Sequence, residues 1–362
     1  MIKTALSKAS DTGVAVADLA QQLAGVAPSL VILFYSVRHD GATIAMLASK
    51  TWPQARTIGC STAGEMIAGE MTDGALVAMA IDQAVADEVS VAMIDDLGES
   101  AQIDAAHARL GALASGDPDT HVGIVLIDGM SGKEEKLMER LGDLSDLRFI
   151  GGSAGDDLAF QATTVFADGR SANNAAVLAI LHVPAGFRIV KTQSFCRTGK
   201  TLIPTRVDTD NREVIEFDHR PASEAYMAAV GATTMEQAAG KFMTNPVGLM
   251  NGDDPYVRSP QVFNGDAMKF YCAVTPGMDL ELLESTDIVK DTAKALDAAN
   301  ADGRVIGLLN FNCILRTLEL KAKNLTDDYA RLFSVPMVGF STYGEADIGH
   351  INQTATMIAF VG

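Results

Sequence analysis

The sequence predicts an α/β fold in which repeated strand–helix–Gly/Ser loop–strand units form mixed sheets, with a β-rich insert in the C-terminal half. Three observations lead to this prediction. One order of elements occurs three times along the chain. The apolar runs within it show little polar alternation, which is typical of strands buried on both faces of a sheet. The stretch between the second and third copies has a different, β-rich pattern.

Each copy of the repeat combines an apolar strand, an amphipathic helix, a loop with glycine and serine, and a second apolar strand. The middle loop is one residue shorter between its glycines, and all three contain Gly-x-Ser, a later glycine and an acid. Helices of this kind pack on the sheets that the strands form. In the order strand, helix, loop, strand, the copies cover residues 30–36, 41–50, 59–65 and 75–81; 123–129, 133–141, 151–157 and 175–181; and 305–311, 327–332, 339–345 and 354–360.

The insert covers about residues 186–283. Two β-type segments flank the turn at 208–212, which predicts a hairpin. Helices are expected at 222–230, entered through Arg220-Pro221, and at 235–243, followed by Asn245-Pro246. Strands then follow near 246–250, 268–274 and 280–284, and a helix near 287–299. This order of strands, helices and strands is similar to that of PAS-like sensor domains.

Length and charge limit the functional classes. A chain of 362 residues favours two domains, expected at 1–185 and 186–362. The formal net charge of −18 disfavours nucleic acid and anionic lipid as partners. The first 18 residues lack a sustained apolar core, and no apolar run reaches the length of a membrane helix. We therefore expect a cytoplasmic protein.

The four cysteines are far apart and form no CxxC pair, so neither a zinc cage nor a disulfide framework is indicated. They are Cys60, Cys196, Cys272 and Cys313. Reduced thiols in a cytoplasmic protein are the simplest interpretation.

Several phrases together resemble the FIST family of sensory proteins, which carry paired N- and C-terminal FIST domains. The resemblance implies a small-ligand sensor that regulates a partner histidine kinase or cyclic-dinucleotide enzyme. It is strongest to the NosP branch, whose members bind haem b and respond to nitric oxide. The phrases are IGCSTAGEM (58–66), FIGGSAGDDLAF (149–160), EFDHRPASEAY (216–226), NPVG (245–248), YVRSP (256–260), FNCILR (311–316) and VGFSTYGE (338–345).

His219 is the candidate haem ligand under this resemblance. A neutral imidazole is a suitable proximal ligand for haem iron, and nitric oxide could release it. Arg220 and Arg258 are candidates for pairing with the haem propionates. Tyr226 is a candidate for lining the apolar slot that the flat haem needs. From the residues alone, a histidine at a helix entry or in solvent is the more common explanation.

The first and third glycine loops are the second candidate site. Ligands of α/β sheets gather at strand ends, where such loops offer hydroxyls and backbone amides. The alternative is a pair of tight turns that need glycine, with the acids bonded to local amides. The candidate contacts are Ser61, Thr62, Glu65, Ser341, Thr342, Tyr343 and Glu345.

A catalytic role is not expected. Residues 151–155 match the G-x-S-x-G string, but the segment after Ser153 has no helical pattern. Cys60 has no histidine near it in sequence. The resemblance thus implies a non-catalytic haem and nitric-oxide sensor. A haem-free receptor for an amino acid or similar metabolite is the alternative, followed by a ligand-free scaffold; a homodimer is compatible with each.

Overall fold

The computed structural model describes residues 1–252, 254–301 and 303–362. The chain forms two compact units that are discontinuous in sequence. The repeat unit consists of Met1–Lys191, Thr292–His350 and Ala355–Gly362, and the insert unit of Thr192–Asp291 and Ile351–Thr354. The expected domains, 1–185 and 186–362, follow chain order instead. The two divisions differ because the third repeat packs with the first two.

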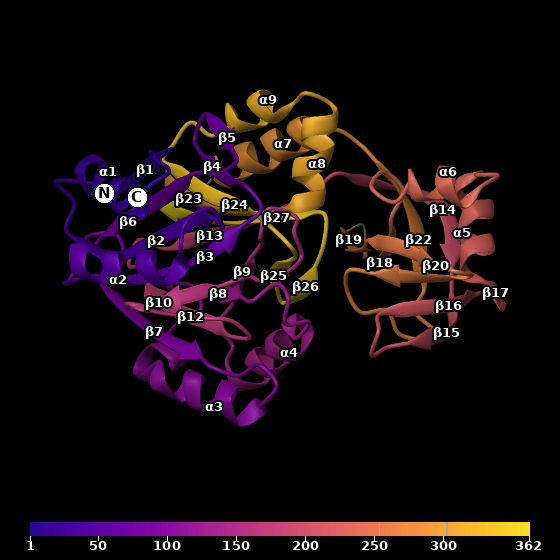
Figure 1. The fold of residues 1–362 in the computed structure, drawn as a ribbon, viewed down its shortest axis with the longest axis horizontal. Coiled ribbons are helices and arrows are strands. Elements are labelled where there is room, and N and C mark those ends of the chain that lie inside the picture. Colours follow the sequence, from indigo (N-terminus) through magenta and orange to yellow (C-terminus); the bar gives the residue numbers. More distant parts are fainter. Residues whose placement is uncertain (253, 302) are drawn as a thin grey trace. The chain divides into compact units, whose positions relative to one another are not determined.

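The α/β prediction with mixed sheets is confirmed, and all three repeats are present (Figure 1). Each begins with a long strand, continues through helix to a parallel second strand, and ends with an antiparallel strand beside the first. The first repeat has β2 (Pro28–Ser36), α2 (Gly41–Thr51), β3 (Arg56–Thr62) and β6 (Leu76–Asp82); the second has β8 (His121–Ile127), α4 (Glu134–Leu144), β9 (Phe149–Ser153) and β12 (Ala176–His182); the third has β23 (Val305–Cys313), α8 (Ile314–Ala322), α9 (Thr326–Ala330), β24 (Met337–Thr342) and β27 (Thr354–Val361).

Each repeat also contains elements outside the repeated order of strand, helix, loop and strand. A strand precedes every copy, and a short hairpin follows every glycine loop. The preceding strands are β1 (Ile2–Ser7), β7 (Glu88–Ile94) and β13 (Phe187–Gln193), and the hairpins are β4 (Glu65–Ile67) with β5 (Glu70–Thr72), β10 (Val165–Ala167) with β11 (Arg170–Ala172), and β25 (Glu345–Asp347) with β26 (Gly349–Ile351). Further helices are α1 (Thr12–Gln22), α3 (Ser100–Arg109) and the 3-10 turn η1 (Gly111–Ser115).

The three hairpins are exchanged cyclically between the sheets. The first repeat's hairpin joins the third sheet, in the order β13-β27-β23-β24-β4-β5. The second repeat's hairpin joins the first sheet, β1-β6-β2-β3-β10-β11, and the third repeat's joins the second, β26-β25-β9-β8-β12-β7. In Figure 1 the purple strands β4 and β5 accordingly lie beside the yellow strands β23 and β24. The exchange brings the loops that precede the hairpins together.

The first position of each loop must be glycine for the same structural reason in all three repeats. A Cβ at Gly59, Gly151 or Gly339 would lie 2.1, 1.7 or 2.2 Å from a carbonyl oxygen of the adjacent parallel strand. The oxygen belongs to the register partner in each case: Leu33, Val125 and Asn310. No side chain fits at this point, so the Gly-x-Ser pattern reflects a close approach of two backbones.

One hydrophobic cluster fills the space between the three sheets of the repeat unit and contains residues from each of them. Phe34 of the first sheet packs against Phe340 of the third with ring centroids 4.5 Å apart. The outer faces are covered separately, the first sheet by α1 and α2 and the second by α3 and α4. Because both faces of the sheets are buried, their strands need no polar alternation.

The insert unit is β-rich, as expected. Among the described residues it has two antiparallel sheets, β14-β22-β18-β19 and β15-β16-β21-β20, with β17 pairing β16. Strands, helices and strands follow in the expected order. The elements are β14 (Phe195–Leu202), β15 (Pro204–Asp208), β16 (Glu213–Phe217), β17 (Arg220–Pro221), α5 (Ala222–Val230), α6 (Met235–Ala239), β18 (Val247–Asn251), β19 (Asp254–Arg258), β20 (Pro260–Asn264), β21 (Ala267–Phe270) and β22 (Leu280–Ser285); α7 (Ile288–Asn300) leads back to the repeat unit.

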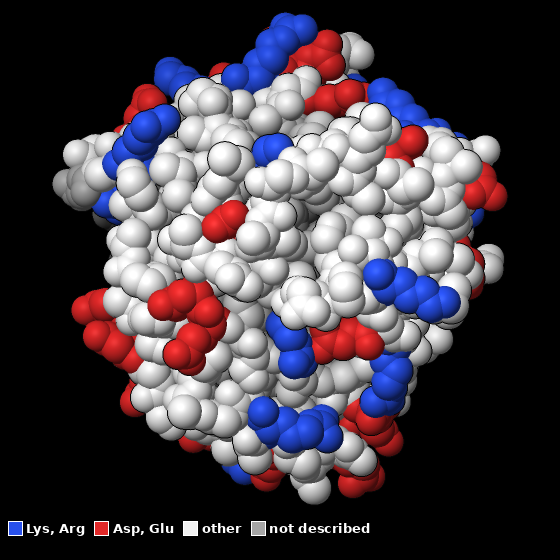
Figure 2. Space-filling model, turned by 90° about the vertical axis from the view of Figure 1, so that its left-hand side faces the viewer, with Lys and Arg blue, Asp and Glu red and all other residues white. Residues whose placement is uncertain are grey.

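Acidic and basic side chains are interspersed on the face shown in Figure 2, with wide areas that carry neither. This face has no basic stripe that would follow a phosphate backbone.

Candidate functional site

The three glycine loops, about 90 to 280 residues apart in sequence, meet in the repeat unit. Backbone hydrogen bonds connect each loop to the other two. Gly155 N donates to Ser61 O (3.0 Å), Ala63 N to Ser341 O (3.2 Å), Ser341 N to Gly64 O (2.8 Å), Tyr343 N to Ser153 O (3.1 Å) and Ser153 N to Gly344 O (2.8 Å). The sequence-predicted contacts of the first and third loops therefore belong to one junction.

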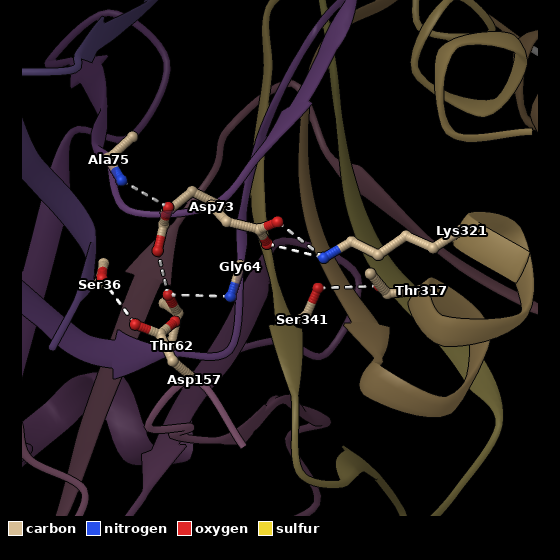
Figure 3. A network of polar contacts seen from close by, with 10 residues as sticks. Ser36, Thr62, Gly64, Asp73, Ala75, Asp157, Thr317, Lys321 and Ser341 are labelled. Atoms are coloured by element: carbon tan, nitrogen blue, oxygen red, sulfur yellow. Dashed lines mark hydrogen bonds and ion pairs between the residues drawn. The ribbon is translucent and has the colours of Figure 1, made fainter. Parts of the chain in front are cut away.

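A cavity of about 200 Å³ lies at this junction, between the first loop with its hairpin and the helices α8 and α9. Glu65 and Ser341 are the two sequence-predicted residues that line it. Lys321 on α8 donates to both carboxylate oxygens of Asp73, at 2.9 and 2.8 Å (Figure 3). The lining residues are Gly64, Glu65, Met71, Thr72, Asp73, Thr317, Lys321, Thr326 and Ser341.

Glu65 is a buried acid, with only 1% of its surface exposed. Thr62 Oγ1 donates to its Oε1, and the backbone N–H of Ala75 donates to its Oε2 at 2.9 Å. Burial raises the pKa of Glu65 to about 7; the two hydrogen bonds oppose this effect, and the negative charges of Asp157 and Asp73 add to it. The carboxyl group therefore changes its charge near neutral pH.

Glu345 repeats this arrangement in the third loop without lining the cavity. Thr342 Oγ1 donates to its Oε1, as Thr62 does to Glu65. Glu345 is fully buried and pairs with Gly152 across β25 and β9. Equivalent sequence positions thus have different surroundings.

A buried polar network leads from the cavity to the underside of α8. Thr317 Oγ1 and Ser341 Oγ are 2.8 Å apart, and the side-chain amide of Asn312 donates to Thr317 at 3.0 Å. Asn312 Oδ1 accepts from Arg316 Nε at 3.0 Å and from the Tyr329 hydroxyl at 3.1 Å. The cavity is thereby joined to both α8 and α9.

Tyr343 and Asp156 hold the second and third loops together. The Tyr343 hydroxyl donates to Asp156 Oδ1 and accepts from Leu158 N at 2.9 Å. Burial opposes ionisation of Asp156, but Tyr343 and three backbone N–H groups outweigh it and lower its pKa. Burial and the hydrogen bond to Asp156 raise the pKa of Tyr343. This contact stabilises the loop structure. The Tyr343 hydroxyl and the Asp156 carboxylate are already hydrogen-bonded within the chain, so they are poorly suited to bind a ligand.

The sequence-predicted haem residues lie in the insert unit. His219 is exposed in the tight turn before β17, where its backbone has a left-handed φ of 61° and its N–H donates to Thr205 Oγ1. Arg220 is also exposed. Tyr226, by contrast, is fully buried, and its hydroxyl donates to Asn245 O at 2.8 Å. Arg258 is partly buried; its Nη1 donates to Val257 O, and its buried Nε has no hydrogen bond among the described residues.

The groups considered for catalysis are buried. Cys60 is fully buried, which raises the pKa of its thiol well above the usual value. Ser153 is also fully buried, and its Oγ has no hydrogen-bond partner in the described part of the chain. A turn and the hairpin strand β10 follow β9, where a nucleophile elbow would require a helix.

Sequence analysis did not identify Asp73, Thr317, Lys321 or Thr326. The Gly/Ser signal could not reveal them because they lie outside the loops. Within residues 1–252, 254–301 and 303–362, no group of three or more His, Cys, Asp or Glu side chains could hold a metal ion. No helix in these residues is long and apolar enough to cross a membrane.

Comparison with protein families agrees with the repeated architecture. The FIST N domain matches residues 29–220, and the FIST C domain matches residues 222–346. The FIST N match covers the first two repeats, and the FIST C match covers most of the insert and the loop of the third. No curated protein matches the sequence. FIST domains are sensory signalling domains for small ligands, and this chain belongs to the FIST family.

Proposed function

We propose that this chain is a cytoplasmic, non-catalytic sensor whose small ligand binds in the cavity at the loop junction. The observation that carries the proposal is the convergence of three distant loops, of which the first and third line a cavity of about 200 Å³. Drug-sized ligands occupy pockets of about 300–1,000 Å³, so this volume suits a smaller molecule such as an amino acid or a similar metabolite. Hydroxyl, carboxyl and ammonium groups line the cavity and would orient a polar ligand.

Binding would be transmitted through α8 and α9. Lys321 and Thr317 lie on α8, Thr326 begins α9, and all three line the cavity. A ligand that contacts these side chains stabilises one position of the two helices relative to the loops. The partner is a histidine kinase or a cyclic-dinucleotide enzyme. The position of α8 and α9 would transmit ligand binding to this partner.

A ligand screen tests the cavity. Free amino acids and small organic acids are added to the purified chain, and the unfolding temperature is measured. Thr326→Leu narrows the cavity and should remove the response to any stabilising compound. Thr209→Leu makes the same change at an exposed turn in the insert and should preserve the response. A response that survives in Thr326→Leu would place the ligand elsewhere.

Haem b with nitric oxide as the signal is the second candidate. The exposed His219 supports it because the imidazole is accessible to a large planar group, with the exposed Arg220 next to it. Homodimer formation would be one way to cover such a group.

The absorption spectrum tests this second candidate. The purified chain is mixed with haemin, reduced and exposed to nitric oxide. A sharp Soret band that shifts with nitric oxide is expected in the wild type and in His182→Ala, and it should disappear in His219→Ala. A spectrum equal to that of free haemin, or one unchanged in His219→Ala, would exclude His219 as the ligand.

A further inference from the structure

We propose that the ligand of the loop cavity carries an ammonium group, which Glu65 binds as its counter-ion. This inference rests on the proposed ligand site at the loop junction. It adds the chemical class of the ligand, which follows from the charges that line the cavity.

The lining contains two acids and one base. Lys321 is bound by both carboxylate oxygens of Asp73, so these two charges balance each other. Glu65 is bonded to a hydroxyl and a backbone N–H, neither of which is charged. No basic side chain forms an ion pair with Glu65 in the described part of the chain.

A buried carboxylate without a counter-charge is unfavourable, and it either binds a cation or takes up a proton. Asp73 and Asp157 increase this tendency because both place further negative charge near Glu65. Lys321 is the basic group on the cavity wall, and Asp73 already binds it. A small organic cation would therefore neutralise Glu65 better than any group that the cavity itself contains.

The hydrogen-bonding capacity of the cavity agrees with an ammonium donor. An ionised carboxylate accepts about four hydrogen bonds, and Glu65 accepts two from the chain. Ser341 and Thr317 contribute hydroxyl oxygens to the same wall. An ammonium group has three donors and no acceptor, so it complements these oxygens. An anionic group placed against Glu65 would instead be repelled.

Binding of an ammonium group requires ionised Glu65, so the protonated acid must release its proton. With the pKa of Glu65 at about 7, affinity should be about tenfold lower at pH 6 than at pH 8. Close to one proton should be released per ligand at pH 6. Isothermal titration in two anionic buffers with different heats of ionisation measures this release from the difference in heat, without any substitution and without a competing ammonium group.

Ethylammonium, acetate and acetamide are suitable probes because they are of similar size and differ in charge. Ethylammonium at millimolar concentration should stabilise the wild type and release a proton, and acetate and acetamide should not stabilise it. Glu65→Gln should weaken ethylammonium binding at least tenfold. Glu70→Gln, a partly exposed position on β5 of the same hairpin, should leave it unchanged.

Two results would overturn the inference. In the first, acetate or acetamide stabilises the wild type but not Thr326→Leu, and ethylammonium stabilises neither. The proposed ligand class is then wrong, and the cavity remains the ligand site. If ethylammonium binds equally to wild type, Glu65→Gln and Thr326→Leu, neither Glu65 nor the cavity holds it. The second result would contradict the proposed function as well.

Discussion

Replacement of Glu65 by glutamine should stabilise the folded chain at high pH and leave its stability nearly unchanged at low pH. Burial raises the pKa of Glu65 from an ordinary value of 4.5 to about 7. Between these two values the folded chain holds a proton that the unfolded chain has lost, so the free energy of unfolding falls as pH rises. Below 4.5 both states are protonated, and above 7 both are ionised.

The size of the effect follows from this interval. One pH unit corresponds to about 1.4 kcal/mol, so ionisation of Glu65 costs about 3 kcal/mol above pH 7. Glutamine resembles the protonated acid: its oxygen can accept from Ala75 N, and its amide can donate to Thr62 Oγ1. We therefore expect the free energy of unfolding of Glu65→Gln to exceed that of the wild type by about 3 kcal/mol at pH 8 and to equal it near pH 4.5.

Denaturant unfolding followed by tryptophan fluorescence measures this difference. Trp52 is the single tryptophan of the chain and lies in the repeat unit, so its signal reports on the unit that contains Glu65. The measurement is made from pH 4.5 to pH 8.5 on both proteins. A difference that stays constant across this range would refute the assignment of a raised pKa to Glu65.

Three other substitutions test single buried polar side chains. Asp156→Asn should cost about 1–3 kcal/mol at pH 7 through its loss of the charged contact with Tyr343. Because the pKa of Asp156 is lowered in the folded chain, this cost should begin to fall as pH drops below the ordinary value of 3.8 and should disappear once pH has fallen through the lowered pKa, as measured by denaturant unfolding from pH 7 downward. Tyr226→Phe removes the hydroxyl bonded to Asn245 and should lower the unfolding free energy of the insert by about 1 kcal/mol, as measured by far-ultraviolet circular dichroism. Thr57→Val replaces a buried hydroxyl without a described partner and should leave the thermal midpoint equal or higher.

The repeats could be predicted because their strands are buried on both faces and their glycines have one shared cause. Long apolar runs such as β2 and β8 follow directly from this burial. The exchange of the hairpins could not be predicted, because strands of three residues such as β4 and β25 are too short to show a period. Their sheet partners lie in other repeats, so only the folded chain identifies them.

The helix α8 explains why half of the cavity was missed. It begins at Ile314, directly after β23 ends at Cys313, with no turn between them. The apolar run of the strand therefore continues into the helix, and the periodicity signal favours only the later helix, at 327–332. That helix is α9, at Thr326–Ala330. Thr317 and Lys321 belong to α8, so the loop prediction supplied Glu65 and Ser341 without the opposite wall.

The three loops share their backbone arrangement, but their acidic side chains have different surroundings. This difference bears on where a ligand would bind. The backbone contact at each first glycine is common to all three and explains the Gly-x-Ser pattern as structure. The acids differ in their surroundings: Glu345 lies against β9, and Asp156 is saturated by Tyr343 and backbone N–H groups. Glu65 alone among these three lines the cavity, and its pKa lies near neutrality. The shared motif therefore identifies the scaffold, and we propose the ligand site at Glu65 because it is the acid of these three that lines the cavity.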